Sequence, residues 1–295
     1  MPSPCCLLWR PCVAPLFASC VLLSIVAEVP AQTPIEIVPD VVYGHKDGLA
    51  MTFDVFKPTE NSNGAAVVFM VSGGWRSRWT PPEATRGFFE PFLVKGFTVL
   101  SVRHGSSPKY GIPDAVSDVR RAIRFIRLHA DDYGIDEKRI GVFGMSAGGH
   151  LSLMLATTGD DGQSDSTDPV LKVSNRVKSV AAVVPPSDLR IAVWSAPESL
   201  PAYRNYPALD MSVEQAAEYS PLLFVTKDDA PALIVSGSLD ELVPPKHGQW
   251  IADAYEKEGL PHKFLLLETN HGLQNKRAEV MSSIVEWFAE TLQAE

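Results

Sequence analysis

Residues 140–150 read Ile-Gly-Val-Phe-Gly-Met-Ser-Ala-Gly-Gly-His, and this stretch decides the fold. Its apolar first part predicts a buried strand, and the small residues from Ala147 onward favour a helix. The Gly-x-Ser-x-Gly turn between them would hold the hydroxyl of Ser146 clear of its neighbours. Side chains at positions 144 and 148 would collide with the adjoining strand or helix in so tight a turn. The stretch therefore predicts a strand, a sharp turn with Ser146 at its tip, and a helix.

The chain on both sides of this turn alternates between strands and helices. Two strands, 35–43 and 50–56, come first and are joined by turn residues 46–48. Further strands are predicted at 66–71, 97–102, 139–143, 177–184, 232–236 and 262–267, and helices at 113–130, 147–157, 246–258 and 276–292. This alternation indicates an α/β fold with a mostly parallel central sheet flanked by helices. In such sheets the reactive groups gather at the carboxyl ends of the strands.

Length and composition fit one large domain behind a leader. The chain has 295 residues, of which 45% are hydrophobic and 21% charged, enough for a single α/β domain with a full core. Arg10, an apolar run over 13–27 and Val29-Pro30-Ala31 predict a signal peptide, residues 1–31, cleaved after Ala31. Residues 32–295 would then form the domain, in a secreted or periplasmic protein. The apolar run is short for a spanning helix, so no stable membrane anchor is expected after cleavage.

The cysteines and the charge balance exclude several classes of function. All four cysteines lie in the predicted leader, so the mature chain would have no disulfide and no thiolate metal site. The net charge of −9 argues against a nucleic-acid partner. One basic cluster lies on the helix predicted at 113–130, and we expect a solvated helix face there. The cluster consists of Arg120, Arg121, Arg124 and Arg127.

Two segments between predicted elements have other compositions. Residues 159–169 are rich in aspartate but lack the terminal glutamate of an EF-hand, so a solvated loop is favoured over a calcium site. Residues 188–229 are rich in proline and aromatic side chains. An insertion of this length between two strands is predicted to form a small cap that shapes the substrate pocket. The alternative is a packing excursion that contacts no ligand.

A nucleophilic serine needs a base, and His271 fits that role best. It follows the strand predicted at 262–267 by a short loop, and Gly272 leaves that loop free to bend. His150 is expected to pack beside the turn. His104 lies in an Arg-His-Gly sequence that matches the phosphoenzyme motif of histidine phosphatases, but that motif follows the first strand of its domain. We therefore treat His104 only as a candidate substrate-binding residue.

A carboxylate must orient the base, and Asp240 is the favoured candidate. It follows the strand predicted at 232–236 by a short loop, which places it at the same sheet edge as His271. The order Ser146, Asp240, His271 is that of an α/β-hydrolase triad. Glu241 is an alternative, but neighbouring side chains on an extended loop point apart, so only one of the two can meet the histidine. Asp188, after the preceding strand, is a further alternative.

An oxyanion hole requires two backbone N–H groups. One is expected from Ala147, directly after the serine and at the start of its helix. The other is expected from Gly73 and Gly74, which follow the strand at 66–71 and let a substrate carbonyl approach the main chain. The alternative for the two glycines is a structural turn. Trp75 comes next and is a candidate wall of the substrate pocket, the alternative being that it covers the edge of the core. No metal or cofactor is expected.

With these residues placed, the chain resembles the α/β-hydrolase superfamily. Within it the chain is similar to the esterase and lipase group related to hormone-sensitive lipase and to the secreted feruloyl and acetylxylan esterase-like proteins. The resemblance covers nearly all of residues 40–293 and is carried by residues 72–75, 133–136, 144–150, 237–244 and 271–272. It implies Ser146 as nucleophile, Asp240 and His271 as its partners, and hydrolysis through an acyl-enzyme without metal or cofactor.

Two departures from the group's pattern lie near the expected acyl pocket. Ser72 stands where the group has a histidine before the oxyanion glycines, and Val-Arg-His-Gly at 102–105 replaces its Tyr-Arg element. We expect an exported serine carboxylic-ester hydrolase acting on small or carbohydrate-linked acyl esters. The alternatives are a serine peptidase of the prolyl oligopeptidase type and a noncatalytic binding protein built on the same fold. The sequence makes no prediction about the oligomeric state.

Overall fold

The computed structural model describes residues 1–3 and 33–294. The chain divides into two units, Met1–Gln32 and Thr33–Glu295, and the helices and strands below all belong to the second. The predicted signal peptide, residues 1–31, lies outside the described residues from position 4 onward. Within the described ranges, every helix is too short or too polar to cross a bilayer.

One sheet of eight strands organises the described residues. The strands are β1 (Ile35–Lys46), β2 (Leu49–Pro58), β3 (Ala66–Met70), β4 (Thr98–Val102), β5 (Ile140–Met145), β6 (Ser179–Val183), β7 (Ala232–Gly237) and β8 (His262–Leu267). Their order in the sheet is β1-β2-β4-β3-β5-β6-β7-β8. β2 pairs antiparallel with both β1 and β4, and the remaining neighbouring pairs are parallel. The predicted hairpin and the mostly parallel α/β sheet are thus confirmed.

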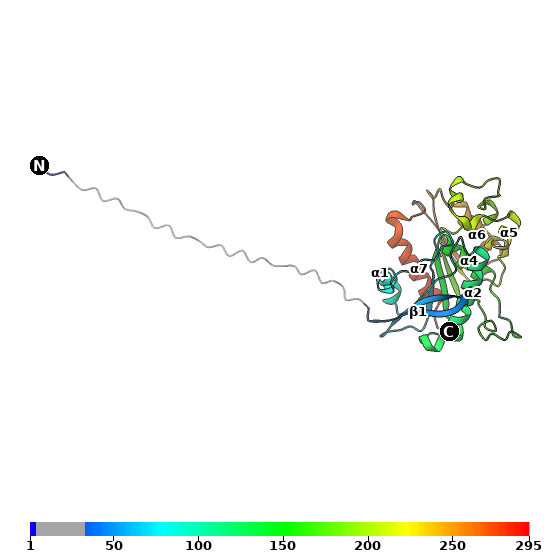
Figure 1. Ribbon diagram of the computed structural model, residues 1–295. Coiled ribbons are helices and arrows are strands. Elements are labelled where there is room, and N and C mark those ends of the chain that lie inside the picture. Colours follow the sequence, from blue (N-terminus) through cyan, green and yellow to red (C-terminus); the bar gives the residue numbers. More distant parts are fainter. Residues whose placement is uncertain (4–32, 295) are drawn as a thin grey trace. The chain divides into compact units, whose positions relative to one another are not determined.

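Helices cover both faces of this sheet. They are α1 (Pro82–Leu93), α2 (Ile112–Leu128), α3 (Ala130–Tyr133), α4 (Ala147–Thr157), α5 (Val213–Glu218), α6 (Lys246–Lys257) and α7 (Arg277–Thr291). Figure 1 shows α1 and α7 on one side of the sheet and α2, α4 and α6 on the other. Each side has its own apolar core, one built with α1 and α7 and the other with α2, α4 and α6. Burial on both faces explains why the central strands are mostly apolar.

Helix α1 is absent from the sequence-based prediction. It begins with Pro82, contains Gly87 and carries Pro91 near its end. Glycine and an internal proline both disfavour a helix, so local preference hides this element. Tertiary packing compensates, because Phe89 and Phe92 are buried against the sheet. The helix supplies the crossover between the parallel strands β3 and β4.

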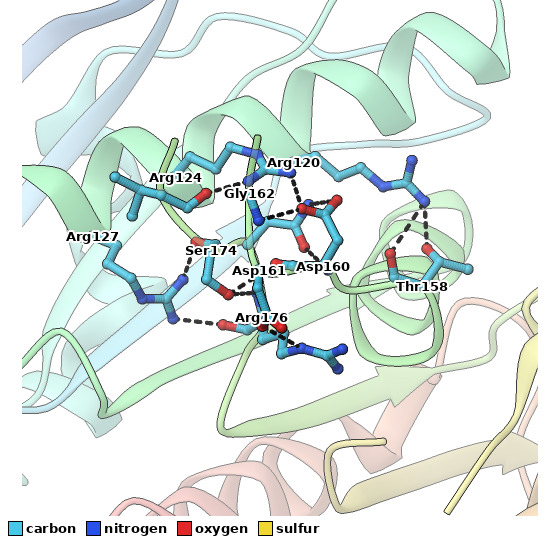
Figure 2. A network of polar contacts seen from close by, with 11 residues as sticks. Arg120, Arg124, Arg127, Thr158, Asp160, Asp161, Gly162, Ser174 and Arg176 are labelled. Carbon is cyan, nitrogen blue, oxygen red and sulfur yellow. Dashed lines mark hydrogen bonds and ion pairs between the residues drawn. The ribbon is translucent and has the colours of Figure 1, made fainter. Parts of the chain in front are cut away.

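The arginines of α2 do not form a solvated face, so that expectation is wrong. The side chain of Arg124 is only 6% exposed and lies 2.5 Å from a carboxylate oxygen of Asp160. The guanidinium groups also donate to backbone carbonyls of the loop after α4: Arg124 to Val173, and Arg127 to Ser174 and Arg176. Figure 2 shows these contacts between the helix and residues 158–176. The arginines thus fasten this loop onto α2.

The same contacts explain the aspartate-rich segment at 159–169. The Asp160 carboxylate accepts hydrogen bonds from Arg124, the Gly162 N–H and Asn175. Asp168 pairs with Arg121 at 2.6 Å. These two carboxylates therefore have protein cations as partners. The arginines of α2 and the aspartates of the loop therefore bind one another, and this contact is structural.

The turn at Ser146 adopts the geometry that the glycines permit. The backbone of Ser146 has φ +57° and ψ −121°, a conformation that residues other than glycine rarely adopt. A Cβ atom at Gly144 would lie 2.4 Å from the carbonyl carbon of Gly148, and one at Gly148 would lie 2.7 Å from the Met70 carbonyl oxygen. Neither contact is possible without moving backbone. The two glycines therefore allow β5 to pass directly into α4, with Ser146 held between them.

Replacing Gly144 with alanine should force this turn apart. Because the new methyl group would overlap backbone, we expect Gly144→Ala to lower the free energy of unfolding by about 2 kcal/mol or more. Gly87→Ala is the matched control, since a Cβ there meets nothing within 4 Å and should stabilise α1 by about 0.5–1 kcal/mol. Urea denaturation measures both. Equal stability of the two variants would show that the turn is not sterically restricted.

Breaking the contact between α2 and the acidic loop should also cost stability. We expect Arg124→Met to lower the free energy of unfolding by about 1–3 kcal/mol, because the loop carbonyl and Asp160 lose a buried partner. Arg176→Met removes an exposed ion pair to Asp161 in the same loop and should cost less than about 1 kcal/mol. Urea denaturation of both variants tests this, and an equally small effect for both would contradict the prediction.

Candidate active site

Three side chains from distant parts of the sequence meet at the carboxyl ends of the strands. Ser146 follows β5, Asp240 follows β7 and His271 follows β8. Nε2 of His271 lies 2.9 Å from Oγ of Ser146, and Nδ1 of His271 lies 2.8 Å from Oδ2 of Asp240. The parallel order β5-β6-β7-β8 brings these three loops to one edge. The residues singled out in the sequence therefore form a continuous chain of hydrogen bonds.

The surroundings of Asp240 orient its carboxylate. Its side chain is fully buried, and Oδ1 accepts the backbone N–H groups of Leu242 at 2.9 Å and Val243 at 2.8 Å. Oδ2 remains for His271. Of the alternatives, Glu241 is exposed, and Asp188 forms an ion pair with Arg190 at 2.7 Å. Asp240 is thus the one carboxylate among these candidates that contacts His271.

The hydrogen-bond partners assign the proton on His271. A carboxylate only accepts, so Nδ1 carries the hydrogen that points to Asp240. Nε2 is then free to accept the hydroxyl proton of Ser146. This arrangement lets the imidazole take a proton from the serine while the buried carboxylate stabilises the resulting cation. The three groups can therefore generate a serine nucleophile.

The backbone around Ser146 offers donors for an oxyanion. Ala147 is the first residue of α4, where backbone N–H groups have no acceptor within the helix. The segment Ser72–Arg76, here called the oxyanion loop, contributes Gly74, which borders the cavity beside Ser146. In the part of the chain that the structure describes, the Gly74 N–H has no protein acceptor. The N–H groups of Ala147 and Gly74 are therefore both available as donors.

Gly73 differs from expectation. Its N–H donates to the Arg76 carbonyl at 3.0 Å, and the Arg76 N–H donates back to the Gly73 carbonyl at 3.2 Å. These two bonds close a tight turn, and they engage the N–H that was expected to face the oxyanion. The turn also sets Gly74 at φ +59° and Trp75 at φ +55°. Gly73 shapes the oxyanion loop, and Gly74 is the residue that presents a free donor.

A small apolar cavity lies beside Ser146. Its volume is about 20 Å³, which is room for roughly one water molecule. Trp75 lines this cavity, as expected. Four lining residues come from the insertion at residues 188–229: Ala192, Tyr203, Tyr206 and Leu209. The cavity therefore has walls from both the oxyanion loop and the insertion.

The insertion packs over the site as a series of short helices. These are η1 (Leu189–Ile191), η2 (Pro201–Asn205), η3 (Pro207–Leu209), α5 and η4 (Pro221–Phe224), while a further short helix, η5 (Gln274–Lys276), precedes α7. The ring of Tyr206 lies so close to the oxyanion loop that a Cβ at Gly74 would be 2.4 Å from its Cδ1 atom. A side chain at position 74 would therefore displace the insertion. In the sequence, the length of the insertion and its prolines and aromatic residues were the signals that it lies over the site.

His104 occupies a different place from the one predicted. It is buried, and its Nδ1 donates to the Gly105 carbonyl at 2.8 Å, so Nε2 accepts the hydroxyl of Ser72 at 2.9 Å. Burial lowers the pKa of His104, which favours this neutral form. His104 is not among the residues that line the cavity. The two departures from the group's pattern are thus one hydrogen-bonded pair, which anchors the start of the oxyanion loop.

Comparison with known proteins agrees with this architecture. A carbohydrate esterase from gut microbiota superimposes with a TM-score of 0.75 at 25% identity, over 88% of this chain and 98% of its own. Esterase 2 of Thermogutta terrifontis has a TM-score of 0.70 at 22% identity, over 90% of this chain and 99% of its own, and shows the fold alone.

Curated relatives include two proteins of Mycobacterium tuberculosis. The probable carboxylic ester hydrolase LipM is 27% identical over 72% of this chain, and the esterase LipC is 27% identical over 69%. The chain spans about half the length of these relatives, 50% and 51%. The BD-FAE family model matches residues 53–255, a range that contains Ser146 and Asp240. The chain therefore belongs to the BD-FAE family, within the α/β-hydrolase superfamily.

Proposed function

We propose that this protein is an exported serine carboxylesterase that hydrolyses small or carbohydrate-linked acyl esters through an acyl-enzyme. The observation that carries the proposal is the chain of hydrogen bonds from Ser146 through His271 to the buried Asp240, with spacings of 2.9 and 2.8 Å. The names of the relatives support the reaction class, since LipM and LipC are described as ester hydrolases. The gut carbohydrate esterase supports a sugar on the alcohol side.

In the proposed reaction, Oγ of Ser146 attacks the acyl carbonyl carbon while Nε2 of His271 takes the hydroxyl proton. The carbonyl oxygen becomes an oxyanion, which the N–H groups of Ala147 and Gly74 stabilise. Collapse breaks the bond to the alcohol oxygen, and His271 returns the proton to that oxygen. Water then attacks the acyl-enzyme with His271 again as base, which releases the acid and restores the serine.

The small cavity beside Ser146 supports a short acyl group. Its walls are apolar, and its volume of about 20 Å³ leaves room for about the methyl group of an acetyl ester. We therefore expect turnover of nitrophenyl esters to fall as the acyl chain grows beyond a few carbons.

An ester panel tests the activity. We expect the purified protein to hydrolyse nitrophenyl acetate and acetylated sugars, and Ser146→Ala to reduce kcat about 10⁴-fold or more, because the nucleophile is lost. Ser282→Ala, at an exposed serine on α7, is the control and should keep wild-type turnover. Equal activity of the wild type and Ser146→Ala would refute the proposal.

Two further probes separate the alternative functions. The rat acylamino-acid-releasing enzyme is 27% identical over 81% of this chain, while the chain covers 33% of that protein. N-acetylated amino-acid amides and proline amides therefore belong in the panel, and a preference for them over esters would favour a peptidase. A fluorophosphonate should label Ser146, since the serine is activated. No adduct would favour a noncatalytic binding protein.

Export has its own test. The leader-like composition of residues 1–31 supports cleavage after Ala31, followed by secretion or release into the periplasm. When the full chain is expressed in a bacterium, we expect the product outside the cytoplasm with Gln32 at its N-terminus. Cell fractionation and N-terminal sequencing measure this. A cytoplasmic product that retains Met1 would contradict export.

A further inference from the structure

His150 makes contacts that the proposed reaction does not use. It lies one turn into α4, and its backbone N–H donates to the Ser146 carbonyl at 2.9 Å. Its side chain is fully buried. Nδ1 lies 3.2 Å from Nε1 of Trp75, and Nε2 lies 2.7 Å from the carbonyl oxygen of Tyr219. One partner belongs to the oxyanion loop and the other to the insertion, so His150 joins two parts of the site.

The two partners fix the protonation of His150. An indole N–H can only donate, and a carbonyl oxygen can only accept. Nδ1 is therefore the acceptor for Trp75, and Nε2 carries the hydrogen that points to Tyr219. Burial lowers the pKa of His150 to about 4, so the imidazole is neutral at neutral pH. In this form it serves both partners at once.

Trp75 needs an anchor because its backbone is strained. Its φ of +55° is a left-handed conformation that bulky residues seldom adopt. Two hydrogen bonds hold it: its carbonyl oxygen accepts the Ser107 N–H at 3.0 Å, and its indole donates to His150. The indole and imidazole rings also meet edge-on, with centroids 5.4 Å apart. Without the His150 contact, Trp75 can relax and rotate the adjoining peptide of Gly74.

The other partner links the insertion to the same residue. Tyr219 directly follows α5 as its C-terminal cap, and its carbonyl oxygen accepts the His150 hydrogen bond. The insertion touches the oxyanion loop a second time, where the ring of Tyr206 packs on Gly74. The oxyanion loop is therefore bonded to α4 through His150 and contacts the insertion through Tyr206.

We propose that His150 is a positioning residue, which sets the oxyanion loop through Trp75 and ties that loop to the insertion through Tyr219. The proposal rests on the proposed esterase function. An oxyanion donor is effective only when it lies about 2.7–3.1 Å from the developing charge. A displacement of about 1 Å can reduce the rate about a hundredfold. His150 thus acts on kcat without touching the substrate.

Two substitutions separate the contacts of His150. In His150→Asn the amide oxygen can take the position of Nδ1 and accept the Trp75 indole, whereas in His150→Gln the longer amide can reach Tyr219 but leaves the indole without an acceptor. With nitrophenyl acetate we expect His150→Gln to lower kcat about tenfold to a hundredfold, with KM changed less than about threefold. His150→Asn should recover most of that loss.

A double-mutant cycle ties the effect to Trp75. Trp75→Phe removes the indole donor, and the double variant with His150→Gln should be no slower than the slower single variant, because both break one contact. Trp287→Phe is the matched control, since it removes a buried indole hydrogen bond of 2.9 Å to Val180 that lies on the α7 side of the sheet. It should keep the wild-type kcat. Thermal unfolding sets an assay temperature at which all variants are folded.

The outcomes distinguish this proposal from the proposed function. The wild type and Ser146→Ala, assayed in parallel, decide whether the protein is an esterase. Hydrogen exchange of residues 72–76 gives a readout that does not need turnover: it should be faster in His150→Gln than in His150→Asn. The positioning role is overturned if His150→Gln has wild-type kcat, if His150→Asn is no better than His150→Gln, or if exchange in this segment is unchanged.

Discussion

The close approach of two backbones at Gly144 and Gly148 is the constraint on which the site depends. With no side chain at either position, β5 can turn into α4 within one residue, although Ser146 must then adopt φ +57°. This strained turn places the Ser146 hydroxyl at the sheet edge where the loops after β7 and β8 also lie. The buried cores on both faces of the sheet stabilise it, because relaxing the turn would move β5 or α4 out of well-packed contacts.

Much of the fold could be predicted because its signals are local. The strands and most helices show the expected periodicity, and their observed ends differ from the predicted ends by only a few residues. Helix α1 could not be predicted in this way, since Gly87 and Pro91 disfavour a helix and only the burial of Phe89 and Phe92 selects one. For the arginines of α2 the local pattern was clear, but it predicted the wrong environment. Their spacing is typical of a solvated face, but their partners lie in a loop that begins some thirty residues later.

In the candidate site, too, some features could be predicted from the sequence and others could not. The order of Ser146, Asp240 and His271, each placed just after a strand, was enough to predict that they meet, because parallel strands bring their ends together. The donor of the oxyanion loop could not be assigned, since the bond from the Gly73 N–H to Arg76 depends on how the turn closes. The pairing of Ser72 with His104 joins residues 32 positions apart, and each looked like a separate departure when read singly.

The packing of Tyr206 on Gly74 has a consequence for how such sites diverge. A Cβ at position 74 and the ring at position 206 would occupy the same space, so the two residues form a size-matched pair. One of them belongs to the oxyanion loop after β3, and the other to the insertion between β6 and β7. A larger side chain at position 74 therefore requires a different packing of the insertion, and the observed position of the Tyr206 ring requires glycine at position 74. Under the proposed function, a change in the insertion that reshapes the pocket would also press on the proposed oxyanion donor, so acyl selectivity and the rate of hydrolysis would be linked.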